Sequence, residues 1–279
     1  MSTSYDLVIR GGTLVTHDGI GPGDVGVRDG RIVEVGQLRG ADGGEVIDAT
    51  GLHVLPGIID TQVHFREPGN EHKEDLESGT RAAVMGGVTA VFEMPNTNPL
   101  TTTEDALNDK LARADGRAWS DYAFYVGATT DNAESLRELE ILPGCCGIKI
   151  FMGSSTGSLL VPDDDSLRRV LESCRRRVAV HAEDEERLKV RSHIAAEGAH
   201  PRAHPDWRDV ETAFNATRRL ISLAEELRRR VHVLHVTTAD EAAYLAEHKD
   251  VASVEVTPQH LTLEAPDCYE RLGAFAQMN

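Results

Sequence analysis

Four side chains that could bind a metal ion lie at or just beyond the carboxyl ends of four apolar segments. His64 follows the first segment, Lys149 lies in the fourth, His181 in the fifth and His235 in the sixth. Imidazole nitrogens and the carbamate of a carboxylated lysine suit divalent ions of the zinc type. A histidine at the end of one strand is usually a structural residue, but four such groups in one sheet predict a shared metal site.

The elements that must position these residues are apolar strands alternating with amphipathic stretches, a pattern typical of βα units in a parallel sheet. In a TIM-type (β/α)8 barrel the carboxyl ends of the strands converge on one mouth, where active sites are built. An eighth strand is not found, and an unclosed barrel would leave two strand edges unpaired. We therefore expect an α/β fold with an incomplete TIM-type barrel, in a chain that stops short of its natural end. The seven expected strands lie around residues 54–60, 88–94, 122–126, 147–151, 178–182, 231–236 and 252–256.

The first 50 residues have a different pattern. Short alternating segments are separated by glycine-rich turns such as residues 28–31, which predicts a small antiparallel β unit with hairpins. We expect two domains: an N-terminal β unit over residues 1–52, and the barrel over residues 53–279 without its last strand and C-terminal part.

Composition narrows the class of protein. A formal net charge of -17 argues against nucleic acid and anionic membranes as partners. No apolar run approaches the roughly 18 residues that a membrane span needs. The four cysteines include no CxxC pair, which argues against a disulfide framework or a thiolate zinc site. We expect a cytoplasmic protein that forms a homo-oligomer.

Five segments of the chain form a set of motifs: 60–69 (DTQVHFREPG), 73–79 (KEDLESG), 82–89 (AAVMGGVT), 94–97 (MPNT) and 147–151 (GIKIF). In type and order they resemble the motifs of dihydroorotases, which are hydantoinase-like cyclic amidases of the amidohydrolase superfamily. The resemblance covers nearly the whole chain, and its combined specificity is high.

The resemblance implies a metal-dependent hydrolase that interconverts dihydroorotate, a carboxylated cyclic ureide, and N-carbamoyl-aspartate in pyrimidine biosynthesis. It implies one or two zinc ions and a carboxylated Lys149. The matched metal ligands are His64, Lys149, His181 and His235, and the matched substrate-binding residues are Arg66, Asn96 and Asn279. The family's catalytic aspartate on strand eight has no counterpart in this chain, so the catalytic residue is unknown and activity of the chain itself is not predicted.

One departure from the family pattern concerns the metal. Gln62 occupies the position of the first histidine of the family's His-x-His pair, and an amide oxygen is a much weaker zinc ligand than imidazole. We therefore expect at most one ion, bound first by Lys149, His181 and His235. Two alternatives stay open: a non-catalytic homologue that acts as a scaffold for a pyrimidine-pathway enzyme, and a hydantoinase- or allantoinase-type cyclic amidase.

Several other residues invite simpler interpretations. Arg66 could form a loop ion pair with Glu67 or Glu71 instead of binding substrate. We expect His232 to be a packing residue, and the polar connection over residues 194–208, which contains His200 and His204, to be a solvated loop. The two acidic residues at 183 and 184 could orient the ring of the preceding histidine or begin a helix.

Overall fold

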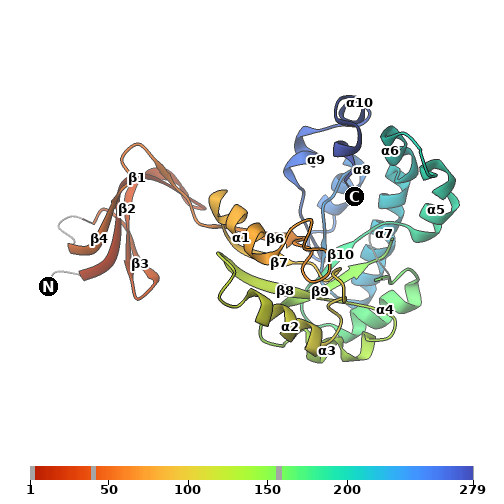
Figure 1. Cartoon of the computed structure of the whole chain (residues 1–279), viewed down its shortest axis with the longest axis horizontal. Helices are drawn as coiled ribbons and strands as arrows, with labels where there is room; N and C mark the ends of the chain where they lie inside the picture. The colour runs from red at the N-terminus through yellow and green to blue at the C-terminus, as the bar shows by residue number, and fades with distance from the viewer. Residues whose placement is uncertain (1–3, 39–41, 155–158, 279) are drawn as a thin grey trace. The chain divides into compact units, whose positions relative to one another are not determined.

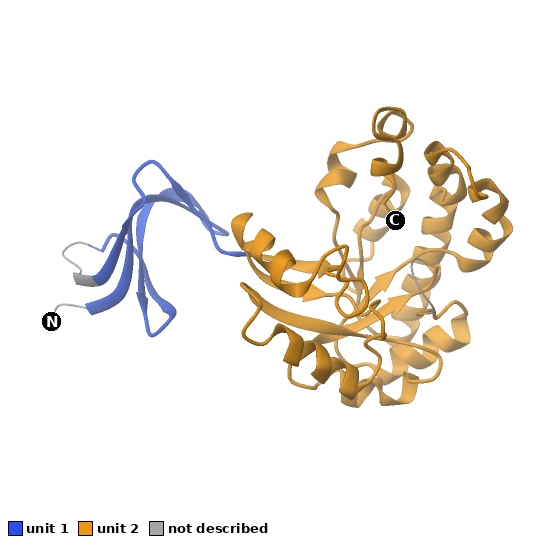
Figure 2. Ribbon diagram, in the orientation of Figure 1, with its two compact units in different colours: residues 1–58 blue, residues 59–279 orange. Residues whose placement is uncertain are grey.

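The structure is a computed structural model of the 279-residue chain, and it describes residues 4–38, 42–154 and 159–278 (Figure 1). The chain divides into two compact units, residues 1–58 and residues 59–279 (Figure 2). The domain boundary expected at residue 52 stays a prediction.

The first unit is a five-stranded sheet with the order β3-β2-β1-β4, in which β5 also pairs with β1. Its antiparallel pairs, β1 with β2 and β2 with β3, confirm the small antiparallel unit with hairpins. Asp29 and Gly30 both have positive φ in the β2–β3 turn, as the tight hairpin turn requires. Unlike the prediction, β4 and β5 pair with β1 in parallel. The strands are β1 (Ser4–Thr16), β2 (Gly19–Arg28), β3 (Arg31–Gly36), β4 (Asp42–Asp48) and β5 (His53–Val54).

The second unit is built on a seven-stranded parallel sheet whose strands follow chain order from β6 to β12. The sheet curls into a half-barrel, which confirms the incomplete TIM-type barrel (Figure 1). Its strands are β6 (Ile58–Val63), β7 (Val88–Glu93), β8 (Asp121–Gly127), β9 (Cys145–Phe151), β10 (Val178–His181), β11 (Val231–Val233) and β12 (Ala252–Val254).

The first barrel strand differs from the prediction. It begins at Ile58 rather than near Val54, and His53 and Val54 pair with β1 instead. Pro56 explains the break, because proline has no N–H to donate to a strand ladder. The correction puts Gln62 inside β6 and leaves His64 just beyond its carboxyl end.

Helices connect the strands, and each of the longer ones begins at an aspartate or threonine whose side chain accepts a hydrogen bond from a backbone N–H. The caps of this kind are Asp75, Thr103, Asp163, Asp209 and Thr238. The longer helices are α1 (Leu76–Met85), α2 (Glu104–Ala114), α4 (Asp164–Ser173), α7 (Val210–Leu227) and α8 (Ala239–Ala246). The shorter ones are α3 (Leu136–Leu139), α5 (Glu185–Val190), α6 (His204–Trp207), α9 (Pro258–Thr262) and α10 (Asp267–Leu272). None of the helices in the described part of the chain could cross a membrane.

A large core lies between the sheet and its helices, and it makes the strand ends rigid points of attachment. Ile148 and Ile150 of β9 and Val180 of β10 are fully buried in it, alternating with Lys149 and next to His181. Because successive strand residues point to opposite faces, the isoleucines face the helices while Lys149 faces the inside of the half-barrel. The fold thus fixes the polar residues by burying their neighbours.

Candidate metal and substrate site

Two imidazoles face each other at the carboxyl ends of neighbouring strands. His181 is the last residue of β10, His235 lies two residues after β11, and Nδ1 of His181 is 3.0 Å from Nε2 of His235. Two nitrogens bound to one tetrahedral zinc ion would lie roughly 3.3 Å apart, given zinc–nitrogen distances of about 2.0–2.1 Å. Desolvation holds both pKa values well below the usual value, so both rings are neutral, the form that binds metals.

Lys149 joins this pair from β9, and its side chain is buried. Its charge acts on the pKa of His64, of His181 and of His235, which puts the amine near all three rings. Desolvation holds the pKa of Lys149 well below its usual value. A neutral amine is the form that can react with carbon dioxide to give the carbamate that the family resemblance implies.

His64 and the two expected substrate residues follow the neighbouring strands β6 and β7. Met94 N donates to Val63 O at 2.9 Å, which holds the ends of these strands side by side. Asn96 hydrogen-bonds to the ring of His64, and desolvation, helped by the charge of Arg66, lowers the pKa of His64 to about 3. The structure thus brings together Arg66, Asn96 and His64, while Asn279 lies outside the described residues.

Arg66 does not form the loop ion pairs considered as its alternative role. Glu67 accepts from Arg117 Nη1 at 2.8 Å and from Nη2 at 3.2 Å, and Glu71 accepts from Gly69 N at 2.9 Å. Within the described residues, neither carboxylate pairs with Arg66, whose charge acts instead on His64 and on Glu93. Arg66 has a left-handed backbone with φ 63°, an unusual conformation for a non-glycine residue and one found preferentially at functional sites.

Gln62 carries an unsatisfied acceptor. Its Oε1 is buried, and no hydrogen-bond donor reaches it within the described residues. The same part of the chain contains no group of three or more His, Cys, Asp or Glu side chains that could hold a metal ion. Within the described residues, Lys149 as a carbamate is therefore the group that could add a third ligand beside His181 and His235. These residues fit one metal ion, and they do not supply a second site with three strong ligands.

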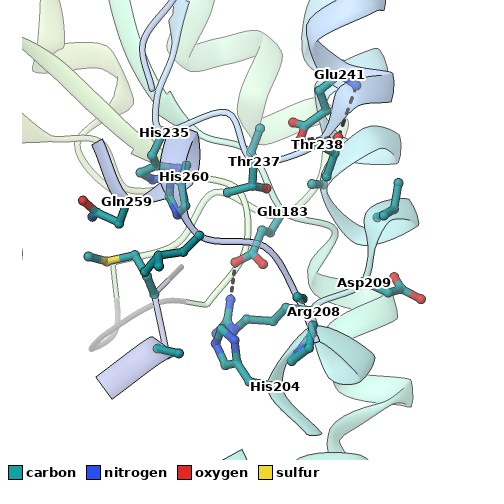
Figure 3. Close-up of a pocket in the computed structure, with 18 of the residues that line it drawn as sticks. Glu183, His204, Arg208, Asp209, His235, Thr237, Thr238, Glu241, Gln259 and His260 are labelled. Carbon is teal, nitrogen blue, oxygen red and sulfur yellow. Dashed lines mark hydrogen bonds and ion pairs between the residues drawn. The ribbon is translucent and has the colours of Figure 1, made fainter. Parts of the chain in front are cut away.

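A buried carboxylate fixes the ring of His181. Glu183 Oε2 lies 2.7 Å from Nε2 of His181. Arg208 pairs with the same oxygen of Glu183 (Figure 3), and it also donates to Ser154 O at 2.7 Å. A carboxylate acceptor puts the proton on Nε2 and leaves Nδ1 as the metal-binding atom. Burial raises the pKa of Glu183 to about 7, and Arg208 opposes that rise. Asp184, in contrast, begins α5 by accepting from Arg187 N.

The prediction of a solvated loop over residues 194–208 is wrong for the last part of that segment. His204 Nδ1 lies 2.9 Å from the hydroxyl of Tyr269, and the Arg208 guanidinium is held by Glu183. Both residues line a cavity of about 240 Å³ together with His181 and His235 (Figure 3). His204 and Arg208 face the cavity because each has a polar partner there. No hydrophobic periodicity in the sequence indicates which way they face, because α6 is a single turn.

His232 belongs to a polar network rather than to simple packing. Its Nδ1 lies 2.8 Å from Ser253 Oγ, and its Nε2 lies 3.1 Å from Glu255 Oε2. Thr61 donates to the same carboxylate at 2.6 Å, and the charge of Glu255 acts on Lys149. The network connects residues of β6, β11 and β12 with Glu255, which sequence reasoning missed.

Comparison with known proteins adds independent information. The model of the Amidohydrolase family matches residues 53–270. The chain is 32% identical over 281 residues to an allantoinase of Deinococcus radiodurans, covering 97% of this chain and 62% of that protein. It is 34% identical over 270 residues to a dihydroorotase of Thermococcus kodakarensis, covering 96% of this chain and 59% of that protein.

Solved structures of similar fold include hydantoinases and a dihydropyrimidinase. An L-hydantoinase (dihydropyrimidinase) from Arthrobacter aurescens superposes with a TM-score of 0.88 at 28% identity, over 95% of this chain and 61% of that one. A dihydropyrimidinase from Brevibacillus agri superposes with a TM-score of 0.81 at 31% identity, over 92% of this chain and 58% of that one. The chain thus spans about three fifths of the length of the relatives it matches.

Proposed function

Because the chain belongs to the amidohydrolase family, we propose that it binds one zinc-type ion and a carboxylated cyclic ureide, as part of a dihydroorotase-type active site. The reaction would open dihydroorotate to N-carbamoyl-aspartate or close it in reverse. The observation that carries the substrate class is the position of Arg66 and Asn96 beside His64, at the ends of neighbouring strands. A guanidinium and an amide at that place suit a substrate carboxylate better than an uncharged ring.

Metal binding and substrate binding would fall to different residues of the proposed site. A divalent ion, when bound, would polarise the ring carbonyl and lower the pKa of bound water towards about 7. His181, His235 and Lys149 would hold that ion, with Glu183 keeping Nδ1 of His181 directed at it. Arg66 would pair with the substrate carboxylate through two parallel hydrogen bonds and so orient the scissile amide.

Proton transfer has no assigned residue in these 279 positions. The aspartate that the resemblance puts on an eighth strand has no counterpart here, and Glu183 is already bound to His181 and Arg208. The tests therefore begin with binding and only then turn to turnover.

Metal content tests the first part of the proposal. We expect about one zinc equivalent per chain after loading and gel filtration, measured by inductively coupled plasma mass spectrometry. His235→Ala should lose that ion, and Gln62→His should move the content towards two by restoring an imidazole beside His64. Two tightly bound equivalents in the wild-type chain would contradict the single-ion site.

Substrate preference tests the second part. Binding or turnover of dihydroorotate should be weakened at least tenfold by Arg66→Ala, because the carboxylate loses its charged partner. Hydantoin and allantoin lack that carboxylate, so their binding should change little. A wild-type chain that prefers hydantoin or allantoin, with Arg66→Ala unchanged, would instead assign it to the cyclic amidases of those names.

A non-catalytic scaffold is the second candidate, and the unsatisfied Gln62 oxygen favours it, because that position lacks the imidazole of a two-metal site. Under this proposal the purified protein would hold less than one metal ion and bind no ureide. It would co-purify with a pyrimidine-pathway enzyme. The expected cytoplasmic location and homo-oligomer belong to both proposals, and cell fractionation and light scattering would test them.

A further inference from the structure

A buried carboxylate anchors the loop that follows β6. Glu67, the residue after Arg66, is only 3% exposed. Its Oε1 accepts from Arg117 Nη1 at 2.8 Å, and its Oε2 accepts from Arg117 Nη2 at 3.2 Å. The same Oε2 accepts from the N–H of Leu76, the first residue of α1, at 3.0 Å. Two parallel hydrogen bonds between a guanidinium and a carboxylate fix orientation as well as distance, so Glu67 is held in one position.

Arg117 is also tied to α2. Its Nη1 donates to Arg113 O, in the last turn of that helix, at 3.1 Å. The ion pair between Glu67 and Arg117 thus joins three segments: the start of α1, the end of α2 and the loop after β6. The side chain of Arg113 has a different partner, because its Nε donates to Asp109 at 2.7 Å. Arg113 Nη1 lies 3.8 Å from Glu67 Oε1, beyond hydrogen-bond distance.

The anchored segment is a turn over residues 66–70, here called the Arg66 turn. Arg66 has a left-handed backbone with φ 63°, and its carbonyl accepts from Asn70 N at 3.0 Å. A non-glycine residue keeps such a backbone only where the surrounding structure imposes it. Because Glu67 is the next residue, its buried side chain restrains the peptide that joins it to Arg66. The backbone of Arg66 is therefore held by contacts of residues that are not part of the proposed site.

The Arg66 turn also supports the loop that carries Asn96. Asn98 N, two residues beyond Asn96, donates to Pro68 O at 2.9 Å. At Gly69 the two segments are so close that a Cβ would lie 2.3 Å from Asn98 O. Both segments that carry the proposed carboxylate-binding residues therefore depend on the same anchor.

We propose that Glu67 and Arg117 are positioning residues for the carboxylate site: their ion pair holds the Arg66 turn in the geometry that binds a substrate carboxylate. This inference rests on the proposed function, since it takes Arg66 and Asn96 as the residues that bind that group. Recognition through two parallel hydrogen bonds depends on the position of the guanidinium to within about 1 Å. Loosening the turn should therefore weaken binding of a carboxylated ligand and spare an uncharged one.

Ligand binding tests the inference with three variants of the zinc-loaded chain: Arg117→Met, Arg117→Lys and the control Arg113→Met. The control is closely matched, because the side chain of Arg113 is 39% exposed and that of Arg117 is 38% exposed, and both lie near Glu67. The control removes the same charge but no hydrogen bond to Glu67. Calorimetry with N-carbamoyl-aspartate and with hydantoin measures the dissociation constants.

Arg117→Met should weaken binding of N-carbamoyl-aspartate about tenfold and leave hydantoin binding near wild type. Arg117→Lys should recover part of the loss, because lysine keeps the charge but cannot form two parallel hydrogen bonds. Arg113→Met should bind both ligands as the wild-type chain does. Equal weakening of both ligands by Arg117→Met, or equal effects of Arg117→Met and Arg113→Met, would overturn the inference.

Hydrogen–deuterium exchange, followed at single amides by NMR, tests the anchor without a ligand. The amides of Asn70 and Asn98 both donate to carbonyls of the Arg66 turn. They should exchange severalfold faster in Arg117→Met than in the wild-type chain, because the turn opens locally more often. Arg113→Met should leave both rates unchanged.

The amide of Met152 is the reference for unfolding of the whole unit, because it donates to His181 O in the buried core. It should change less than the other two amides. Equal acceleration at all three amides would mean that Arg117 only stabilises the fold, and unchanged exchange at Asn70 and Asn98 would mean that it does not hold the turn. Either result would overturn the inference. A wild-type chain that binds neither ligand would overturn the proposed function instead, and the exchange rates would still test the anchor.

Discussion

Glu183→Gln should weaken zinc binding without altering a metal ligand. Glu183 lies 2.7 Å from Nε2 of His181, and the ring of His181 is buried. A hydrogen bond to a charged group contributes about 1.5–3 kcal/mol, and the loss of a carboxylate behind a metal-binding histidine typically costs about 10–100-fold in metal affinity. Glutamine keeps the shape of the side chain but can present an N–H to Nε2, which favours the wrong tautomer of His181.

Competition with a fluorescent zinc chelator measures this effect. The dissociation constant for zinc should rise about tenfold to a hundredfold in Glu183→Gln. Asp184→Asn is the matched control, because the adjacent carboxylate caps α5 and does not contact His181. Equal zinc affinity in Glu183→Gln and wild type would refute the orienting role, as would an equal loss in both variants.

Three further predictions concern stability and the site. The pKa of His64 is about 3 in the folded chain and about 6.5 in the unfolded chain, so between these pH values the unfolded state binds more protons. The free energy of unfolding should therefore fall as the pH drops through that window. His64→Gln should flatten this pH dependence of stability, measured by urea titrations at several pH values. Gly69→Ala should lower the free energy of unfolding by roughly 2–4 kcal/mol, because φ is 101° and the new Cβ would lie 2.3 Å from Asn98 O. Gly87→Ala, which has open space around it, should lower it by only about 1 kcal/mol. Equal urea midpoints for the two variants would contradict this prediction. Arg208→Met should weaken zinc binding less than Glu183→Gln does, because the loss of Arg208 loosens the Glu183 carboxylate but leaves it hydrogen-bonded to His181. A larger loss of zinc affinity in Arg208→Met than in Glu183→Gln, in the same chelator assay, would contradict this prediction.

Much of the fold could be predicted because the strands carry a clear pattern. Lys149 and His181 interrupt apolar runs whose other members are buried, so a polar residue there is conspicuous. The carboxyl ends of parallel strands share one edge, which is why residues 85 positions apart, such as His64 and Lys149, could be expected to meet. The predicted first strand begins too early because apolar residues lie on both sides of Pro56, although the proline separates two strands, His53–Val54 and Ile58–Val63.

The groups that support the site were harder to predict, since each pairs with a residue on another element. Arg208 follows a helix of one turn, and Glu255 follows a strand of three residues, so neither has a period to mark it. A buried lysine elsewhere did leave a signal: Lys110 lies three residues after Leu107 and four before Ala114, both buried, which puts it on the inner face of α2. A charge on the apolar face of a helix predicts a buried partner, and Glu93, whose Oε2 lies 2.5 Å from Lys110 Nζ, is that partner.

A zinc-loaded crystal structure, with the metal located by anomalous scattering, tests the central claim most directly. We expect one ion per chain within about 2.0–2.1 Å of Nδ1 of His181 and Nε2 of His235, with an oxygen on Lys149 as a further ligand. An ion bound elsewhere, or two ions of equal occupancy at this site, would contradict the account.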